Sequence, residues 1–119
     1  LDPRWPLASG PFAELLRLME GGAVFVKLSA PYRISTEGPP YGALIPFVEA
    51  LAAHRPDRLL WATDWPHSEM WSDIPDDLAL AGALGLPQLP AEVRRQILVD
   101  NPAGLYGFEP VDARAAAGG

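Results

Sequence analysis

The stretch LLWATDWPHSEMW, residues 59–71, places one carboxylate at the end of an apolar run. Asp64 follows the apolar residues directly, and Trp61, Trp65 and Trp71 surround it in the sequence. A carboxylate in a partly dry pocket can serve as a general base or as a metal ligand. Aromatic neighbours favour this interpretation, because they exclude water and strengthen local electrostatic interactions. The alternative is structural, since an aspartate after a strand also closes a turn by accepting backbone N–H groups.

Arg33 and Tyr32 are the next residues that could do chemistry, in the loop SAPYRISTEGPP. A guanidinium can bind a substrate carboxylate through two parallel N–H donors, and a neighbouring phenol adds a donor or an aromatic wall. The alternative for Arg33 is a solvated surface position. Lys27 alternates with apolar neighbours. It either faces the inside of a barrel or lies at an edge with its amine in water.

The chain contains two histidines, and they lie far apart in the sequence. His67 follows Asp64 by three residues and either lines the same pocket or is structural, whereas His54 is expected at the surface. Two separated histidines do not form a metal site by themselves. The sequence contains no glycine-rich phosphate loop and no HExxH motif. The candidate site is therefore limited to Asp64 as the catalytic residue and Arg33, Tyr32 and His67 as substrate-binding residues.

Two apolar segments of strand character come directly before these candidates. Residues 23–28 (AVFVKL) precede Arg33, and residues 58–63 (RLLWAT) precede Asp64. The second segment is apolar without alternation, which is typical of a parallel strand covered on both faces. Ligands of parallel α/β folds bind at the carboxyl ends of the strands. We therefore expect both loops to contribute to one site.

Helical patterns alternate with these two strands and predict an α/β fold with right-handed crossovers. A first helix opens at Pro11 and ends at Gly21, and a second covers residues 41–55, with Pro46 in its first turn or at a kink. Helices are also expected over residues 76–84 and 90–99. In the last one Val93, Ile97 and Leu98 should point inward, and Asp100-Asn101-Pro102 should stop it. Two strands cannot bury both faces of a sheet, so a larger sheet is expected.

Composition excludes several classes of protein. The 119 residues carry a formal net charge of −6, which argues against nucleic-acid binding. No apolar run has the roughly 20 residues that a membrane span needs. The absence of cysteine excludes disulfides and indicates a cytoplasmic protein. Residues 1–109 form the expected domain segment, residues 110–119 a flexible tail, and the start at LDPRWP is interpreted as the interior of a longer chain.

Three blocks of sequence resemble one known family. VKLSAPYRIS, PDRLLWATDWPH and ILVDNPAGLYGF, in this order and spacing, resemble the C-terminal portion of the amidohydrolase superfamily, in its amidohydrolase-2 branch. The pairing of KLSAPYR with TDWPH is most similar to 2-pyrone-4,6-dicarboxylate lactonases. The resemblance implies a distorted (β/α)8 TIM barrel. It also implies that residues 23–28 are barrel strand seven and residues 58–63 are strand eight.

The resemblance also implies roles for the candidate residues. The family aspartate that matches Asp64 takes a proton from the attacking water and passes it to the leaving group. In metal-dependent members it also binds one divalent ion, Zn or Mn, whereas lactonase-like members need none. The arginine that matches Arg33 grips a substrate carboxylate. A lactone or ester bond in a small anionic carboxylate is therefore the expected substrate, and decarboxylation by a metal-dependent member is the alternative.

The departures from the family pattern matter as much as the matches. The HxH motif of the first barrel strand and the histidines after strands five and six have no counterpart in these residues. The chain is thus expected to be about the last quarter of a barrel and inactive alone. It should associate with itself or complement the missing portion of the barrel, because open strand edges and an apolar face remain. A truncated, non-catalytic fragment is the third interpretation.

Overall fold

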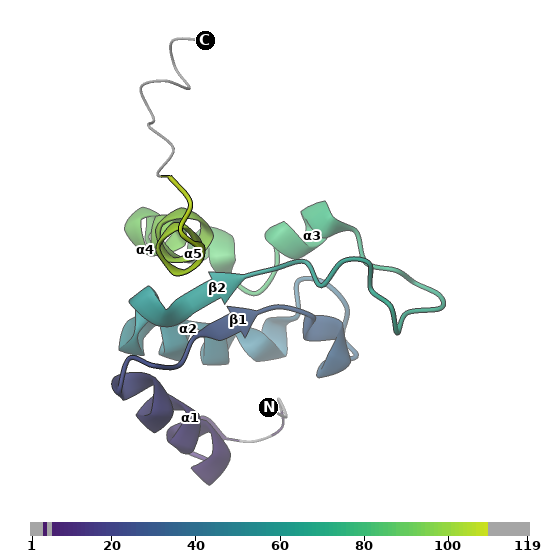
Figure 1. Ribbon diagram of the computed structural model, residues 1–119. Helices are drawn as coiled ribbons and strands as arrows, with labels where there is room; N and C mark the ends of the chain where they lie inside the picture. Colours follow the sequence, from purple (N-terminus) through teal and green to yellow (C-terminus); the bar gives the residue numbers. More distant parts are fainter. Residues whose placement is uncertain (1–3, 5, 110–119) are drawn as a thin grey trace.

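The computed structural model describes Arg4 and residues 6–109, and it alternates helices with two short strands (Figure 1). The order is α1 (Gly10–Glu20), β1 (Val26–Leu28), α2 (Ile45–His54), β2 (Leu59–Trp61), α3 (Asp77–Ala81), α4 (Ala91–Arg95) and α5 (Asn101–Tyr106). Short 3₁₀ turns connect several of them. The predicted tail, residues 110–119, lies outside the described residues. No helix in the described part of the chain is long and apolar enough to cross a membrane.

β1 and β2 pair in parallel, with Val26 opposite Leu59 and Leu28 opposite Trp61. This confirms that the two apolar segments are neighbouring parallel strands. Both strands are shorter than predicted, with three residues each, and Ala62 just beyond β2 still donates its backbone N–H to the carbonyl of Leu28 at 3.4 Å. The parallel pairing places the loops that follow Leu28 and Trp61 at the same edge of the sheet, where the candidate site residues begin.

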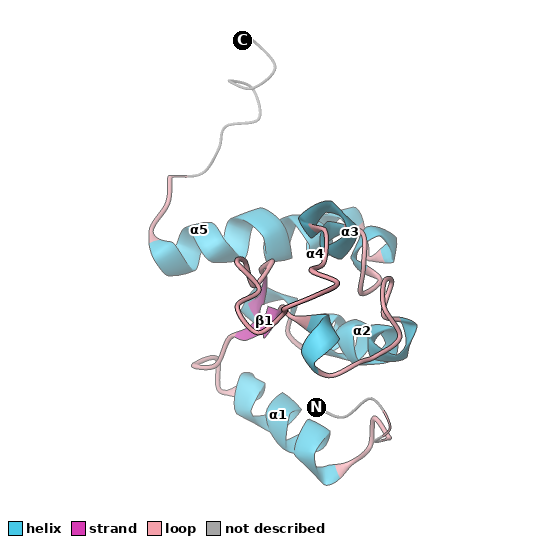
Figure 2. Ribbon diagram, turned by 90° about the vertical axis from the view of Figure 1, so that its right-hand side faces the viewer, coloured by secondary structure: helices cyan, strands magenta, loops and turns pink. Residues whose placement is uncertain are grey.

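The helices pack on the strands around one apolar core. In Figures 1 and 2, α1 lies on one side of the strands and α4 and α5 lie on the opposite side. The core joins Phe12 and Met19 of α1, Leu51 of α2, Leu59 of β2 and Ile97, each at most 1% exposed. Phe12 and Phe47 meet edge to face, with ring centroids 5.1 Å apart. The rings and aliphatic side chains thus fix β2, and with it the loop that begins at Ala62.

The C-terminal helix does not end where the sequence predicted. Residues 91–106 form one continuous helix, in which a π-helical turn at Gln96–Asp100 joins α4 to α5. The backbone N–H of Asn101 donates to the carbonyl of Gln96, five residues back. Pro102 then occupies the first turn of α5, where its missing N–H costs little. The prediction that Asp100-Asn101-Pro102 stops the helix was wrong, because the wider turn accommodates the proline.

Other helix predictions are confirmed in position but not in every side chain. Pro46 lies in the first turn of α2, and Asp76 caps α3 by accepting the backbone N–H of Leu78 at 2.8 Å. Leu98 is exposed although it was predicted to point inward, because Ile97 alone occupies the buried position at this turn. His54 was predicted at the surface but is half-buried. Its Nε2 lies 3.0 Å from the carbonyl oxygen of Leu16 on α1, so the imidazole lies between two helices.

Candidate active site

The structure brings the four predicted site residues together beside the carboxyl ends of the strands. Tyr32 and Arg33 lie in a 3₁₀ turn, Pro31–Arg33, that begins three residues after β1. Asp64 and His67 lie in the loop that follows β2. The side chains from the two loops contact one another, although more than 30 residues separate them in sequence. The expectation that both loops meet is confirmed in geometry, and the chemical roles stay predictions.

One oxygen of Asp64 is the centre of this cluster. Asp64 Oδ2 accepts a hydrogen bond from the Tyr32 hydroxyl at 2.6 Å and from Arg33 Nε and Nη2 at 3.2 and 3.1 Å. The Tyr32 hydrogen bond is the main cause that lowers the pKa of Asp64, desolvation opposes it, and Arg33 adds to the lowering. Desolvation and the hydrogen bond to Asp64 raise the pKa of Tyr32 to about 12. Asp64 is thus an ionised acceptor, and Tyr32 stays protonated as a donor.

The local backbone explains why the carboxylate of Asp64 is aimed at these donors. Asp64 has a positive φ of 64°, a left-handed conformation that aspartate tolerates better than most residues. The turn beside it is closed by a different side chain, because Thr63 Oγ1 accepts the backbone N–H of Trp65 at 3.1 Å. The carboxylate of Asp64 bonds with Tyr32 and Arg33 instead. The geometry therefore favours the functional interpretation of Asp64 over the turn-cap interpretation.

Arg33 is held by two carboxylates. Its Nη2 pairs with Asp64, and its Nη1 donates to Glu69 Oε2 at 2.9 Å. Glu69 is well exposed, so its side chain is free to give way to another anion. Sequence reasoning missed Glu69, because a charged residue in a solvated loop carries no signal of which cation it will contact.

His67 is buried, with 3% of its surface exposed, and it contacts Tyr32 and Asp77. Its Nδ1 lies 2.9 Å from the Tyr32 hydroxyl, and its Nε2 lies 3.1 Å from Asp77 Oδ1. The rings of Tyr32 and His67 also meet edge to face. The sequence predicts Asp77 only as part of the helix expected over residues 76–84, where an acidic residue in the first turn suits the helix dipole. Asp76, directly before Asp77, makes the cap, so a second acidic residue beside a cap was the available signal for another role.

The predicted aromatic wall around Asp64 is wrong for two of its three members. Trp65 is 74% exposed and Trp71 is 94% exposed, and only Trp61 is half-buried. In the described part of the chain, the side chains that hydrogen-bond to the Asp64 carboxylate are the polar Tyr32 and Arg33.

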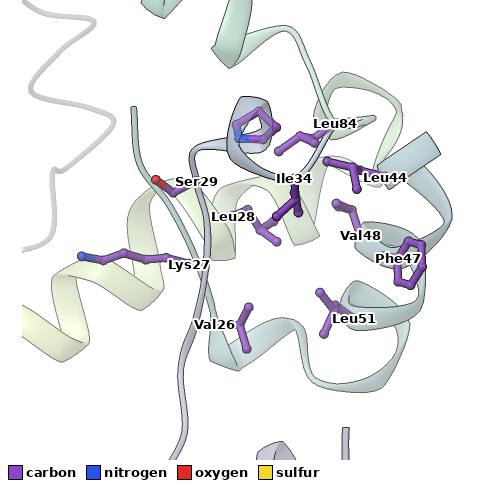
Figure 3. Close-up of a pocket in the computed structure, with 11 residues that line it drawn as sticks. Val26, Lys27, Leu28, Ser29, Ile34, Leu44, Phe47, Val48, Leu51 and Leu84 are labelled. Atoms are coloured by element: carbon purple, nitrogen blue, oxygen red, sulfur yellow. The ribbon is translucent and has the colours of Figure 1, made fainter. Parts of the chain in front are cut away.

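A small apolar cavity lies beside β1 and is separate from this cluster. It has a volume of about 70 Å³ and lies between the strand and α2, where Leu28, Phe47 and Leu51 line it (Figure 3). Lys27 extends away from these side chains and is exposed (Figure 3). The cavity offers no cluster of groups that could do chemistry, and we interpret it as incomplete core packing.

The described residues do not fit a divalent metal centre by themselves. No group of three or more histidine, cysteine, aspartate or glutamate side chains converges in Arg4 and residues 6–109. Asp64 Oδ2 already accepts three hydrogen bonds, and both nitrogens of His67 have protein partners. A metal ion at Asp64 would need ligands from outside these residues and a rearrangement of the Tyr32 and Arg33 contacts.

Together, fold and site define a class of protein: an α/β protein with a carboxylate, a guanidinium and a phenol at the ends of parallel strands. Such a cluster can transfer a proton and hold an anion. An amidohydrolase family model matches residues 2–108 of the chain. The chain therefore belongs to the amidohydrolase family, and the family predicted from the three sequence blocks is confirmed.

Several curated relatives have names that refer to lactones. The chain is 42% identical to 4-sulfomuconolactone hydrolase of Rhizobium radiobacter, over 82% of this chain and 33% of the relative. It is 39% identical to D-galactarolactone isomerase of Agrobacterium fabrum and 38% identical to a 2-pyrone-4,6-dicarboxylate hydrolase of Comamonas testosteroni, over 87% of this chain and 37% of each relative. The chain thus spans about a third of the length of these relatives.

Solved structures agree with this assignment. An apo crystal structure from Agrobacterium tumefaciens matches with a TM-score of 0.76 and 35% identity, over 90% of this chain and 38% of that one. A Pseudomonas putida protein, provisionally described as a 2-pyrone-4,6-dicarboxylic acid hydrolase, matches with a TM-score of 0.73 and 36% identity. That match covers 91% of this chain and 40% of the other.

Proposed function

We propose that this chain supplies the proton-transfer and carboxylate-binding part of a lactone hydrolase that acts on a small anionic substrate. The observation that carries the proposal is the Asp64 carboxylate, ionised and held by Arg33 and Tyr32 beside the ends of two parallel strands. In this proposal β1 and β2 are strands seven and eight of a (β/α)8 barrel. The parallel pairing and the match to about a third of each relative support this assignment.

Asp64 would act first as a base and then as an acid. Asp64 accepts one proton from a water molecule, whose oxygen bonds to the lactone carbonyl carbon. The ring C–O bond breaks, and the leaving oxygen takes this proton back from Asp64. The new carboxylic acid loses the second water proton, so each turnover also releases one proton. The lowered pKa keeps Asp64 ionised and ready to accept at neutral pH.

Arg33 would bind the substrate carboxylate in competition with the carboxylates of Asp64 and Glu69. Its Nη1 contacts Glu69, an exposed side chain that a substrate anion can displace. A carboxylate that draws the guanidinium away from Asp64 would also raise the pKa of Asp64 toward its ordinary value, because the Arg33 hydrogen bonds contribute to the lowering. Substrate binding would thereby make Asp64 a stronger base.

The names of the relatives favour lactone chemistry over the decarboxylase alternative. The three curated relatives described above are two lactone or pyrone hydrolases and one lactone isomerase. A divalent ion, if the whole enzyme uses one, would take most of its ligands from residues other than those described.

The experiment is a hybrid enzyme, in which this chain replaces the matched segment of the Rhizobium radiobacter relative. We expect the hybrid to hydrolyse 4-sulfomuconolactone or 2-pyrone-4,6-dicarboxylate, and Arg33→Met to raise KM far more than it lowers kcat. A folded hybrid that hydrolyses neither lactone, beside an active parent relative, would contradict the proposed function. The 119-residue chain, assayed in parallel for hydrolysis of the same lactones, shows whether it is active without the remaining portion that the relative supplies.

A further inference from the structure

Four side chains form an unbroken line of hydrogen bonds that leads away from the reacting face of Asp64. Asp64 Oδ2 meets the Tyr32 hydroxyl at 2.6 Å, and the Tyr32 hydroxyl meets His67 Nδ1 at 2.9 Å. His67 Nε2 then meets Asp77 Oδ1 at 3.1 Å. The line starts at Asp64, whose side chain is 31% exposed, passes through buried His67, and ends at Asp77, whose side chain is 46% exposed.

The four side chains of this line supply one proton fewer than its three contacts need. Each of the three contacts needs one proton between its two heavy atoms. An ionised aspartate donates none, a phenol donates one, and a neutral imidazole donates one. The four side chains in their ordinary states therefore supply two protons for three contacts. All three contacts are satisfied only when the line holds one additional proton.

The additional proton has three places to reside, and all three give the same total charge. On His67 it makes an imidazolium that donates to both Tyr32 and Asp77. On Asp64 it makes a carboxylic acid that donates to the phenol oxygen, while the phenol donates to Nδ1. On Asp77 it makes a carboxylic acid that donates to Nε2, while Nδ1 donates to Tyr32. Each arrangement changes into the next when protons move across single hydrogen bonds, and no atom has to move far.

We propose that Tyr32, His67 and Asp77 form a proton relay that connects Asp64 with solvent. The relay rests on the proposed function, because lactone hydrolysis releases one proton in each turnover. A substrate seated on Asp64 covers its exposed face, whereas Asp77 at the start of α3 stays open to water. After the leaving oxygen has taken the first proton back, the new carboxylic acid passes the second water proton to Asp64. From Asp64 a proton moves to the Tyr32 oxygen, from the Tyr32 oxygen to His67 Nδ1, and from His67 Nε2 to Asp77, which releases it to water.

This assignment gives His67 a different role from substrate binding. With 3% of its surface exposed, His67 offers no face to a ligand, and its two nitrogens contact protein groups. It acts on the reaction through Tyr32 and is a positioning residue for Asp64. Asp77 orients the imidazole through the contact between its Oδ1 and His67 Nε2, as a carboxylate behind a histidine does in other sites.

The first arm of the test uses the 119-residue chain and needs no activity. The chain has two histidines, so a ¹⁵N spectrum of imidazole nitrogens contains His67 and, as an internal control, His54 at the end of α2. We expect Asp64→Asn to shift the ring nitrogens of His67 when Tyr32 is present. In a chain that already carries Tyr32→Phe, Asp64→Asn should shift the ring nitrogens of His67 much less. The ring nitrogens of His54 should not shift in either chain. Equal shifts with and without the phenol, or no shift at all, would overturn the relay.

The second arm measures catalysis in the hybrid enzyme. Glutamine at position 67 can accept from Tyr32 and donate to Asp77, but it cannot take up a second proton. We expect His67→Gln to lower kcat by about 10²-fold, the low end for a positioned proton-transfer group, with KM unchanged. Because the residues act in series, Tyr32→Phe with His67→Gln should be no slower than the slower single variant. His54→Gln is the matched control and should keep the parent kcat.

The outcomes separate the relay from the proposed function. If Asp64→Asn loses activity but His67→Gln keeps it within twofold of the parent, the relay is overturned and the proposed function is retained. Losses from Tyr32→Phe and His67→Gln that multiply in the double variant would also overturn it, since independent residues behave in this way. Full activity in Asp64→Asn would overturn the proposed function, and the relay would then be decided by the spectrum of the isolated chain.

Discussion

At the scale of single residues, the cluster shows how polar neighbours and not a dry pocket set the state of a carboxylate. Asp64 loses some solvation, which favours its neutral form, but hydrogen bonds from Tyr32 and Arg33 outweigh this effect. The sequence predicted Tyr32 and Arg33 as members of one site with Asp64, from their types and positions after strands, but as substrate-binding residues and not as its hydrogen-bond partners. It could not predict Glu69 and Asp77, because contacts between loop charges depend on backbone turns such as the left-handed conformation of Asp64.

Removal of the Tyr32 hydroxyl should raise the pKa of Asp64. The Tyr32 hydrogen bond is the largest cause of the lowered pKa, so Tyr32→Phe removes the main stabilisation of the ionised form. The ¹³C shift of the Asp64 carboxylate, followed against pH, measures this. Tyr41→Phe is a matched control, since Tyr41 is buried in the core and its loss should leave Asp64 unchanged. A pKa that stays in place in Tyr32→Phe would contradict the hydrogen-bond account.

The lowered pKa of Asp64 also predicts how stability depends on pH. A carboxyl group with a lower pKa in the folded state stabilises the protein above its unfolded value, about 3.9. This stabilisation is lost as the pH falls through the folded pKa. Asp64→Asn should therefore lose less stability than the parent chain between about pH 6 and acid, as measured by urea unfolding. An unchanged pH dependence would show that the carboxylate is not stabilised in the folded chain.

Removal of the Glu69 charge should strengthen the binding of carboxylates to Arg33. Glu69 competes for Arg33 Nη1, and an exposed ion pair of this kind contributes only a small free energy. Glu69→Gln should thus tighten the binding of 2-pyrone-4,6-dicarboxylate by up to about fivefold, measured by calorimetry on the hybrid enzyme. Glu49→Gln on exposed α2 surface is the control for a general change of charge. Equal effects of both substitutions would argue against a local competition.

At the scale of elements, the strands and most helices were predictable because their apolar periodicity decides what they bury. The strand pair and the core position of Leu51 follow from this pattern. The junction of α4 and α5 was not predictable from it. A proline normally ends a helix, and only the π-helical turn at Gln96–Asp100 allows Pro102 to continue one. The exposure of Trp65 and Trp71 was also not predictable, since an aromatic residue type does not reveal whether a loop turns the side chain toward solvent.

Asn101 should be a main link between this helix and β2, the strand that precedes the loop of Asp64. Its Nδ2 donates to the carbonyl oxygens of Pro56 and Leu59, both at 2.8 Å. Asn101→Ala leaves two partly buried carbonyls without this donor and should lower the free energy of unfolding by about 1–3 kcal/mol. Urea unfolding measures it, with Asp100→Asn on the exposed side as the neighbouring control. If both variants unfold at the same urea concentration, the link contributes little.

At the scale of the whole molecule, the apolar side chains on one segment have no cover among the described residues. Leu98, Val99, Leu105, Tyr106 and Phe108 are all exposed on residues 98–108, which we call the C-terminal apolar face. The two strands of the sheet also have no further strand beside them in the described part of the chain. Surfaces of this kind are typical of association sites.

We expect the isolated chain to self-associate through the C-terminal apolar face. Leu105→Lys and Phe108→Lys should reduce the apparent molar mass at high concentration in sedimentation experiments, because they place charge in an apolar contact. Leu18→Lys, at an exposed apolar position on α1, is the matched control and should have little effect. A mass that stays monomeric at all concentrations would contradict this expectation.

The most direct measurement of the central claim is the rate of lactone hydrolysis by the hybrid enzyme when Asp64 becomes asparagine. Asparagine preserves the shape of the side chain and can still accept from Tyr32, but it cannot accept the proton of water. The account predicts a loss of kcat of about 10²–10⁴-fold. Asp73→Asn, in the same loop and exposed, should retain the parent rate. A rate for Asp64→Asn within a few-fold of the parent would contradict the role of Asp64 as the base.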